Sequence, residues 1–162
     1  MSTHTTRRRF LTSTTTTIAL AAALAGCTGG GSDDDDTGDE AGPSDDIDYE
    51  NPDGSVSFVS PADGDEVTSP VSLEMETDGV VIEPAAEGQN DGHGHFHVLV
   101  DVDCLEPGEY IPFEDGYNHF GDGSLEGELD LEPGTYDLCL QVADGGHYAY
   151  ALTDEITITV TE

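Results

Sequence analysis

The feature that most constrains the fold is an alternation of side chains along residues 92–103. Successive side chains of a β-strand point to opposite sides, so one face would carry only the apolar groups Phe96, Val98, Val100 and Val102. The other face carries His95, His97, Leu99, Asp101 and Asp103. We expect the apolar face in a core and the imidazoles outward. Two imidazoles at i and i+2 lie about 6–7 Å apart, close enough to share a metal ion; the alternative is a solvated face that binds nothing.

Similar alternation recurs through the rest of the chain. Short segments near residues 56–58, 71–75, 125–131, 136–142 and 156–160 alternate in the same way, with Gly- and Pro-containing turns between them. No window of useful length shows the 3.6-residue apolar period of a helix. The 162 residues have room for one domain. We therefore predict an all-β domain over residues 55–162, an Ig-like or fibronectin-III-like antiparallel β-sandwich of about seven strands.

One turn supports the Ig-like prediction. Residues 131–138, Leu-Glu-Pro-Gly-Thr-Tyr-Asp-Leu, resemble the turn into the penultimate strand of immunoglobulin-like and fibronectin-type-III domains. In those folds a tyrosine near this corner bonds back to the backbone. The resemblance makes Tyr136 the candidate for this tyrosine corner, with a structural role.

The charge of the chain is extreme. It has 36 acidic residues against three basic ones, and the basic residues are Arg7, Arg8 and Arg9. The acids beyond them repel one another unless cations in solution screen them, and the screening length falls from about 10 Å at 0.1 M salt to about 3 Å at 1 M. This composition favours a halophilic, salt-rich setting. It argues against binding nucleic acid or an anionic membrane surface through charge.

The N-terminus resembles an export signal. Thr-Arg-Arg-Arg-Phe-Leu at 6–11 is similar to a twin-arginine signal, and the apolar run at 18–24 is too short to remain as a membrane span. Leu-Ala-Gly-Cys at 24–27 resembles a lipoprotein lipobox. We expect residues 1–26 to be a signal peptide and Cys27 to carry the lipid that anchors the protein at the outer face of the cytoplasmic membrane. Residues 27–53 are acidic and poor in apolar groups, which predicts a disordered tether.

Two cysteines, Cys104 and Cys139, remain after Cys27 is assigned to the lipid. An even pair in an exported domain favours a disulfide. The alternatives are two buried free thiols or a soft metal site, because sequence alone does not show the distance between the two residues.

Two further histidines, His119 and His147, lie in Gly-rich segments that we expect to be loops flanking strands. If both loops reach the edge of the histidine strand, three or four imidazoles meet. Zinc and copper favour imidazole, with carboxylate as a secondary partner. The candidate metal ligands are therefore His95, His97, His119, His147, Asp101 and Asp144. The alternative is that these are ordinary polar groups of an acidic surface.

The same residues resemble a known family, the domain of unknown function 4399. The resemblance rests on Gly-His-Phe-His at 94–97 with Asp101, His-Phe-Gly-Asp-Gly at 119–123, Leu-Glu-Pro-Gly-Thr at 131–135 and Asp144 with His147, in matching order. It implies a small secreted or lipid-anchored protein and no established activity. Phe96, Tyr117 and Tyr150 stand where other members often have histidine. The shared set is then His95, His97, His119 and His147.

Three functions are compatible with these patterns. The first is a lipid-anchored module that binds a transition metal through the histidines. The second is a cell-surface interaction or adhesion module in which the histidine loops are structural. The third, a hydrolase, ranks last because the chain contains no Gly-x-Ser-x-Gly, His-Glu-x-x-His or P-loop motif and singles out no general base for a zinc-bound water. We therefore do not expect an enzyme.

The charge generates a prediction about salt. Lowering the salt from molar to about 0.1 M removes the screening of the acidic groups, so the domain should unfold at a lower temperature. Thermal unfolding followed by circular dichroism across a salt series measures this. A sharp transition whose midpoint is the same at every ionic strength would contradict the halophilic interpretation.

Overall fold

The computed structural model of the chain describes residues 42–162. The predicted signal peptide over residues 1–26, the lipid on Cys27 and the tether as far as residue 41 lie outside the described residues. In the described part, no helix is both long enough and apolar enough to cross a membrane.

The described domain is all-β, which confirms the predicted fold class. Its strands are β1 (Ser55–Ser60), β2 (Glu66–Thr68), β3 (Val71–Asp78), β4 (Val81–Ile82), β5 (His93–Val100), β6 (Tyr117–Phe120), β7 (Glu126–Leu129), β8 (Gly134–Ala143) and β9 (Ala149–Thr161), with one 3-10 turn at Ala85–Glu87. The strands exceed the predicted seven because β2 and β4 are only three and two residues long. Segments this short carry no readable alternation.

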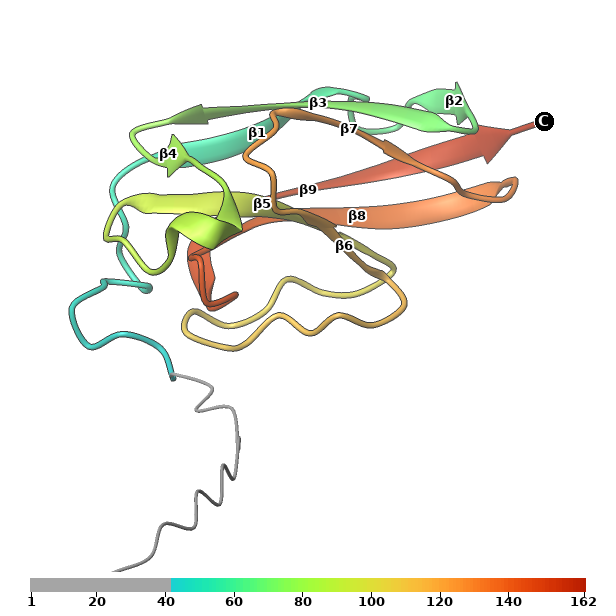
Figure 1. Cartoon of the computed structure of the whole chain (residues 1–162). Helices are drawn as coiled ribbons and strands as arrows, with labels where there is room; N and C mark the ends of the chain where they lie inside the picture. Colours follow the sequence, from blue (N-terminus) through green and yellow to red (C-terminus); the bar gives the residue numbers. More distant parts are fainter. Residues whose placement is uncertain (1–41) are drawn as a thin grey trace, which may run out of the picture. The chain divides into compact units, whose positions relative to one another are not determined.

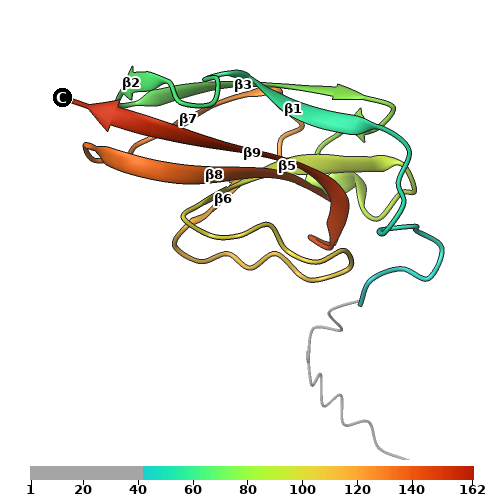
Figure 2. The ribbon, with the colours of Figure 1, turned by 180° about the vertical axis from the view of Figure 1, so that it is seen from behind.

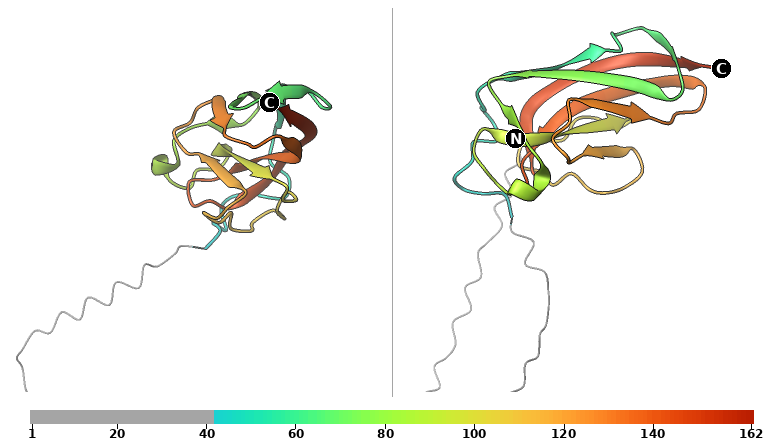
Figure 3. Two further views of the ribbon diagram at one scale, coloured as in Figure 1. Left: turned by 90° about the vertical axis from the view of Figure 1, so that its right-hand side faces the viewer. Right: turned by 45° about the horizontal axis from the view of Figure 1, so that its top comes forward.

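The strands form two sheets that lie face to face. One sheet has the order β1-β3-β7, and the other has the order β2-β9-β8-β5-β4 with β6 also paired to β5. All pairs are antiparallel except β2 with β9 and β4 with β5. Figure 1 shows the small sheet above the large one, and the reverse view of Figure 2 and the turned views of Figure 3 show the same two layers. This is the sandwich that the alternating segments predicted.

The core lies between the two sheets. The small sheet contributes every second residue of β3, where Val71, Leu73 and Met75 are buried and the residues between them are exposed. From β5, Phe96 and Val98 face the same interior and are fully buried. Phe96 and Val98 therefore lie in the core, as the alternation along residues 92–103 predicted.

The opposite face of β5 is also buried, which corrects the expectation of outward imidazoles. His95, His97 and Leu99 are at most 1% exposed. The long connection from β5 to β6 lies on the side of the large sheet away from the small one (Figure 1), and its Ile111 forms a second apolar cluster together with Ala143 and others. The strand parity was therefore right as far as Val100, where β5 ends and Asp101 adopts a left-handed backbone. A covering segment turns the predicted polar surface into an interior.

Side chains of β8 attach the covering segment, residues 101–116, to the sheet in two places. Cys104 and Cys139 form a disulfide, with their Cα atoms 5.7 Å apart. The buried Gln141 side chain accepts a hydrogen bond from the Leu105 backbone N–H (2.9 Å) and donates one to the Leu105 carbonyl oxygen (2.8 Å). Both attachments come from β8, the neighbour of β5, so they hold the segment directly over the histidines.

The predicted tyrosine corner is present in the structure. The Tyr136 hydroxyl donates to the carbonyl oxygen of Glu132 (3.0 Å), the backbone bond expected of a tyrosine corner.

The prediction of a disordered tether is wrong for residues 42–53, which are packed against the domain. Ile47 and Tyr49 are buried in the main core, and the Ala151 N–H donates to the Tyr49 carbonyl oxygen (2.8 Å). Two apolar anchors order a segment whose composition otherwise predicts disorder.

The disulfide generates a prediction about stability. It closes a loop between residues 35 positions apart, so the double variant Cys104→Ser/Cys139→Ser should lose about 3–4 kcal/mol of unfolding free energy. Urea unfolding in molar salt measures the loss. A variant that unfolds at the same urea concentration as the wild type would show that the bond contributes nothing to stability.

Candidate functional site

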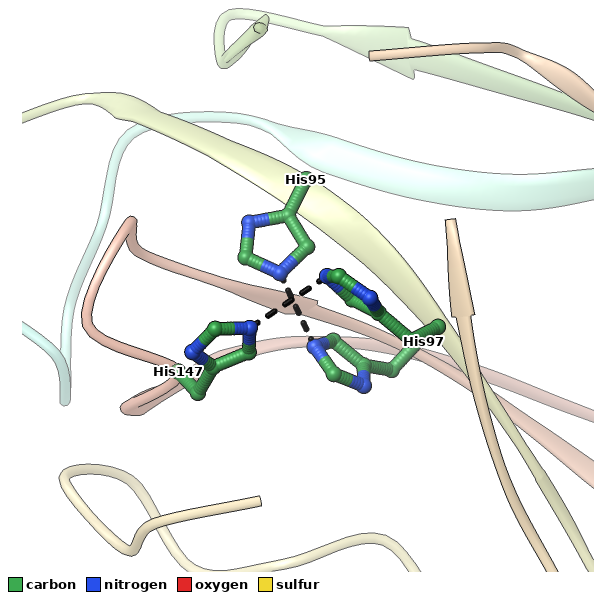
Figure 4. Close-up of side chains that lie close together, drawn as sticks. His95, His97 and His147 are labelled. Carbon is green, nitrogen blue, oxygen red and sulfur yellow. Dashed lines mark hydrogen bonds between the residues drawn. The ribbon is translucent and has the colours of Figure 1, made fainter. Parts of the chain in front are cut away.

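Four histidines from three parts of the chain converge beneath the covering segment. One ring nitrogen from each of His95, His97, His119 and His147 lies within 4.8 Å of the nitrogens of the other three. The Nε2 atoms of His95 and His97 are 3.0 Å apart, and those of His147 and His119 are 3.3 Å apart. Figure 4 shows the rings turned toward one another, with the lines that mark the two close pairs overlapping in this view. The structure thus brings together all four histidines that the sequence singled out.

Strand register explains three of the four positions. His95 and His97 share a face of β5, and His119 on β6 stands directly opposite His97 in the antiparallel pairing. His119 therefore lies in a strand, where we had expected a loop. Its Gly-rich flank concealed the short strand β6. The glycine at 121 is required here, because a Cβ at that position would collide with the His119 ring.

The fourth histidine is delivered by the turn between β8 and β9. Strand β8 ends at Ala143, whose register partner on β5 is His95, so the residues that follow begin beside the cluster. His147 adopts a left-handed backbone with φ of 66°. Its N–H donates to the Asp144 carbonyl oxygen (2.9 Å), and its own carbonyl oxygen accepts from the Ile111 N–H (2.8 Å). The turn and the covering segment together fix the position of this imidazole.

Asp144, a predicted metal ligand, lies outside the histidine cluster. It is fully buried, and its Oδ1 accepts hydrogen bonds from the backbone N–H groups of Gly146 (2.8 Å) and Tyr148 (2.9 Å). Its Oδ2 accepts from the Tyr49 hydroxyl (2.6 Å) and from the Gln89 side chain (2.9 Å). The carboxylate therefore shapes the turn that presents the fourth histidine.

Asp101, the other predicted carboxylate ligand, also lies outside the histidine cluster. It has a left-handed backbone with φ of 55°, and its Oδ1 accepts from the Asp137 N–H (3.0 Å). Both carboxylates were proposed from their nearness in sequence, and in the structure Asp101 accepts from a backbone N–H of β8 and Asp144 from those of the β8–β9 turn. The cluster is therefore a set of neutral nitrogen donors.

The outer side of the cluster is covered by an aromatic group that the sequence reasoning missed. The Phe113 ring centroid lies 4.6 Å from that of His147 and 5.2 Å from that of His119. Tyr110 lies farther out, with its ring 6.1 Å from His147. Phe113 is 60% exposed, which is unusual for phenylalanine and marks it as part of the mouth of the site. Phe113 lies in the irregular connection between β5 and β6, where no alternation of apolar and polar residues predicts its position.

The rings are held in the neutral form by their surroundings. Burial, together with the nearby His119 and His147, lowers the pKa of His95 to about 3. Burial likewise lowers the pKa of His97 to about 2, with added contributions from the three other imidazoles. Burial also lowers the pKa of His119 and of His147, in part offset by Asp122 and Asp144 respectively. Uncharged imidazole is the form that binds metals.

Hydrogen bonding within the cluster does not satisfy every buried atom. A neutral imidazole carries one proton, so in the His95–His97 pair the ring that accepts at Nε2 must carry its proton on Nδ1. The Nδ1 atoms of both rings are buried and have no hydrogen-bond partner among the described residues. One buried N–H is then unpaired, at a cost of about 1–3 kcal/mol. Such a cost in a native core calls for a compensating role.

The lowered pKa values generate a prediction for the metal-free domain. In the unfolded chain these histidines take up protons near their ordinary pKa of about 6.5, whereas the folded domain keeps His95 and His97 neutral to about 3 and about 2. The contribution is fully present above pH 6.5 and is lost as the pH falls. Chelator-treated protein in molar salt should therefore unfold at less urea at pH 5 than at pH 7.5.

The variant His97→Gln, which keeps a polar side chain but cannot titrate, provides the comparison. Its urea midpoint should change less between the two pH values than that of the wild type. Equal pH dependence in both proteins would show that the buried imidazoles do not carry the effect.

Comparison with known proteins gives the family of the chain. No curated protein is similar enough to count as a relative. Among solved structures, the X-ray structure of the endo-beta-1,4-mannanase from Thermotoga petrophila matches 67% of this chain and 20% of its own, at 18% identity and a TM-score of 0.37. The family model described as Domain of unknown function (DUF4399) matches residues 73–161, which include the whole histidine cluster. The chain belongs to this family.

Proposed function

We propose that this domain binds one transition metal ion, zinc or copper, through His95, His97, His119 and His147. The observation that carries the proposal is the convergence of four ring nitrogens, each within 4.8 Å of the others. Imidazole is a preferred ligand of both metals. The proposal makes the cluster a centre in which each ring contributes one nitrogen lone pair.

The energetics favour an ion at this point. The lowered pKa of His95 and His97 keeps protons from competing for their lone pairs at neutral pH. With an ion between the Nε2 atoms, both buried Nδ1 atoms would carry a proton without an acceptor, at about 1–3 kcal/mol each. Coordination in structural zinc sites supplies roughly 10–16 kcal/mol. The gain exceeds the total cost of about 2–6 kcal/mol.

The number of ligands points to binding rather than catalysis. Structural zinc sites are closed by four protein ligands, whereas catalytic sites keep one position for water or substrate. Four histidines with one nitrogen each would fill a tetrahedral ion. We therefore propose a metal-holding module and not a hydrolase.

We place this module outside the cell, attached by a lipid on Cys27 to the outer face of the cytoplasmic membrane. The support is the twin-arginine-like segment at 6–11, the Leu-Ala-Gly-Cys at 24–27 and the disulfide between Cys104 and Cys139, a bond typical of oxidising compartments. In that position the acidic surface would concentrate cations near the histidines.

A second candidate function is a cell-surface interaction module with no metal. The observation that favours it is the pair of imidazole–imidazole contacts, one of 3.0 Å between two rings of β5 and one of 3.3 Å between β6 and the β8–β9 turn. In this alternative the histidines serve only to fix the loops against the sheet.

Metal analysis of the domain purified in high salt separates the two candidates. We expect about one equivalent of zinc or copper in the wild type and none in His95→Ala/His97→Ala. His119→Ala, which alters an exposed ligand and spares the core, should also lose most of the metal. The matched control is His93→Ala, because His93 lies on the same strand but pairs with Glu83 (2.8 Å) outside the cluster.

The control should retain the metal content of the wild type, and circular dichroism confirms that each variant is folded. Equal metal in the wild type and in the folded His119→Ala and double variants would remove the metal proposal. Absence of metal from the wild type, even after incubation with zinc or copper, would leave the interaction module.

A further inference from the structure

We infer that the cluster is built for an ion of tetrahedral preference, Zn²⁺ or Cu⁺, and discriminates against Cu²⁺ and Ni²⁺. This inference rests on the proposed metal-binding function and adds which class of ion the site takes. Square-planar or tetragonal coordination is typical of Cu²⁺ and Ni²⁺, whereas zinc sites in proteins are tetrahedral. The arrangement of the four rings decides between these geometries.

The distances between the ring centroids indicate a tetrahedron. The six distances run from 4.8 Å, between His95 and His119, to 5.6 Å, between His97 and His147. The other four lie between 4.9 and 5.0 Å. Four points at the corners of a square have two diagonals about 1.4 times longer than the sides, as a planar ligand set requires. Here the longest distance exceeds the shortest by less than a fifth.

Two of the six distances between ligand nitrogens are close to those of a tetrahedral site, and the four nitrogens all lie within 4.8 Å of one another. In a tetrahedral zinc site with Zn–N bonds of 2.0–2.1 Å, neighbouring nitrogens lie about 3.3–3.4 Å apart. The Nε2 atoms of His95 and His97 are 3.0 Å apart, and those of His147 and His119 are 3.3 Å apart. In the view of Figure 4 the two lines overlap at an angle, so they are not parallel. Opposite sides of a square are parallel and do not cross, and its diagonals would be about 4 Å long at these bond lengths.

The surrounding structure opposes rearrangement to a planar set. His95 and His97 are fixed in the interior of a paired strand, under a segment joined to the sheet by the disulfide. The His119 ring lies close over Gly121. His147 is on a turn whose backbone donors bond to the buried Asp144 carboxylate. A ligand set held by packed neighbours imposes its own geometry on the ion.

The donor set also excludes hard cations. Calcium and magnesium take oxygen ligands, and the described cluster offers only imidazole nitrogens, with Asp101 and Asp144 bonded elsewhere. Four neutral donors leave the charge of the ion uncompensated within the site, which favours Cu⁺ when copper is bound. The shared chemistry is therefore a small tetrahedral ion with a preference for nitrogen.

Cobalt provides the test, because tetrahedral Co²⁺ absorbs strongly in the visible region and octahedral Co²⁺ absorbs weakly. We expect the metal-free domain to bind one equivalent of Co²⁺ with intense visible bands, and one equivalent of Zn²⁺ to remove them. Zn²⁺ should bind at least about tenfold more tightly than Ni²⁺ in competition. Anaerobic titration with Cu⁺ against a chromophoric chelator then shows which of the two tetrahedral ions binds more tightly.

The outcomes separate this inference from the function on which it rests. Stoichiometric Co²⁺ with a weak, octahedral spectrum, or Ni²⁺ binding as tightly as Zn²⁺, would overturn the tetrahedral inference while metal binding stands. Failure to bind any of these ions would overturn both. His93→Ala should reproduce the wild-type spectrum. His119→Ala should lose the intense bands or shift them, since a water would replace one nitrogen.

Discussion

The structure depends on the burial of β5 on both of its faces. One face packs Phe96 and Val98 into the sandwich core, and the other lies under the segment of residues 101–116 with Ile111. An antiparallel strand of a two-sheet sandwich normally leaves one face to solvent. Here the second cover carries two imidazoles into the interior, where they stay neutral. The neighbours of β5 then add the third and fourth rings by register and by turn.

Burying polar side chains at this face of β5 costs free energy, and hydrogen bonds to specific partners offset it. Buried polar groups are tolerated when they are paired, and Gln141 and Asp144 are fully bonded to backbone or side-chain partners. Within residues 42–162 the histidine cluster differs, because the buried Nδ1 atoms of His95 and His97 have no hydrogen-bond partner there. The disulfide joins the covering segment to the middle of β8, and the Tyr49 hydroxyl donates to Asp144 in the turn that carries His147.

Strand parity made much of this predictable from the sequence. It gave the all-β class and the shared face of His95 and His97, whereas His119 and His147 were added from their Gly-rich segments, which were expected to be loops near the same edge. It did not predict the burial of that face, because the covering segment has no periodic pattern and its position is set by tertiary contacts. It assigned Asp144 to the metal by proximity in sequence, whereas the carboxylate bonds the turn. It also missed the order of residues 42–53, where only Ile47 and Tyr49 supply the anchoring apolar surface.

Our central proposal is that the four imidazoles converge because together they bind one metal ion. Anomalous diffraction from crystals of the domain grown with zinc, measured at the zinc absorption edge, tests this most directly. The account predicts a single strong peak about 2.0–2.1 Å from one nitrogen of each of the four rings. A zinc-containing crystal with no anomalous peak among the four histidines, or with zinc only on surface carboxylates, would contradict it.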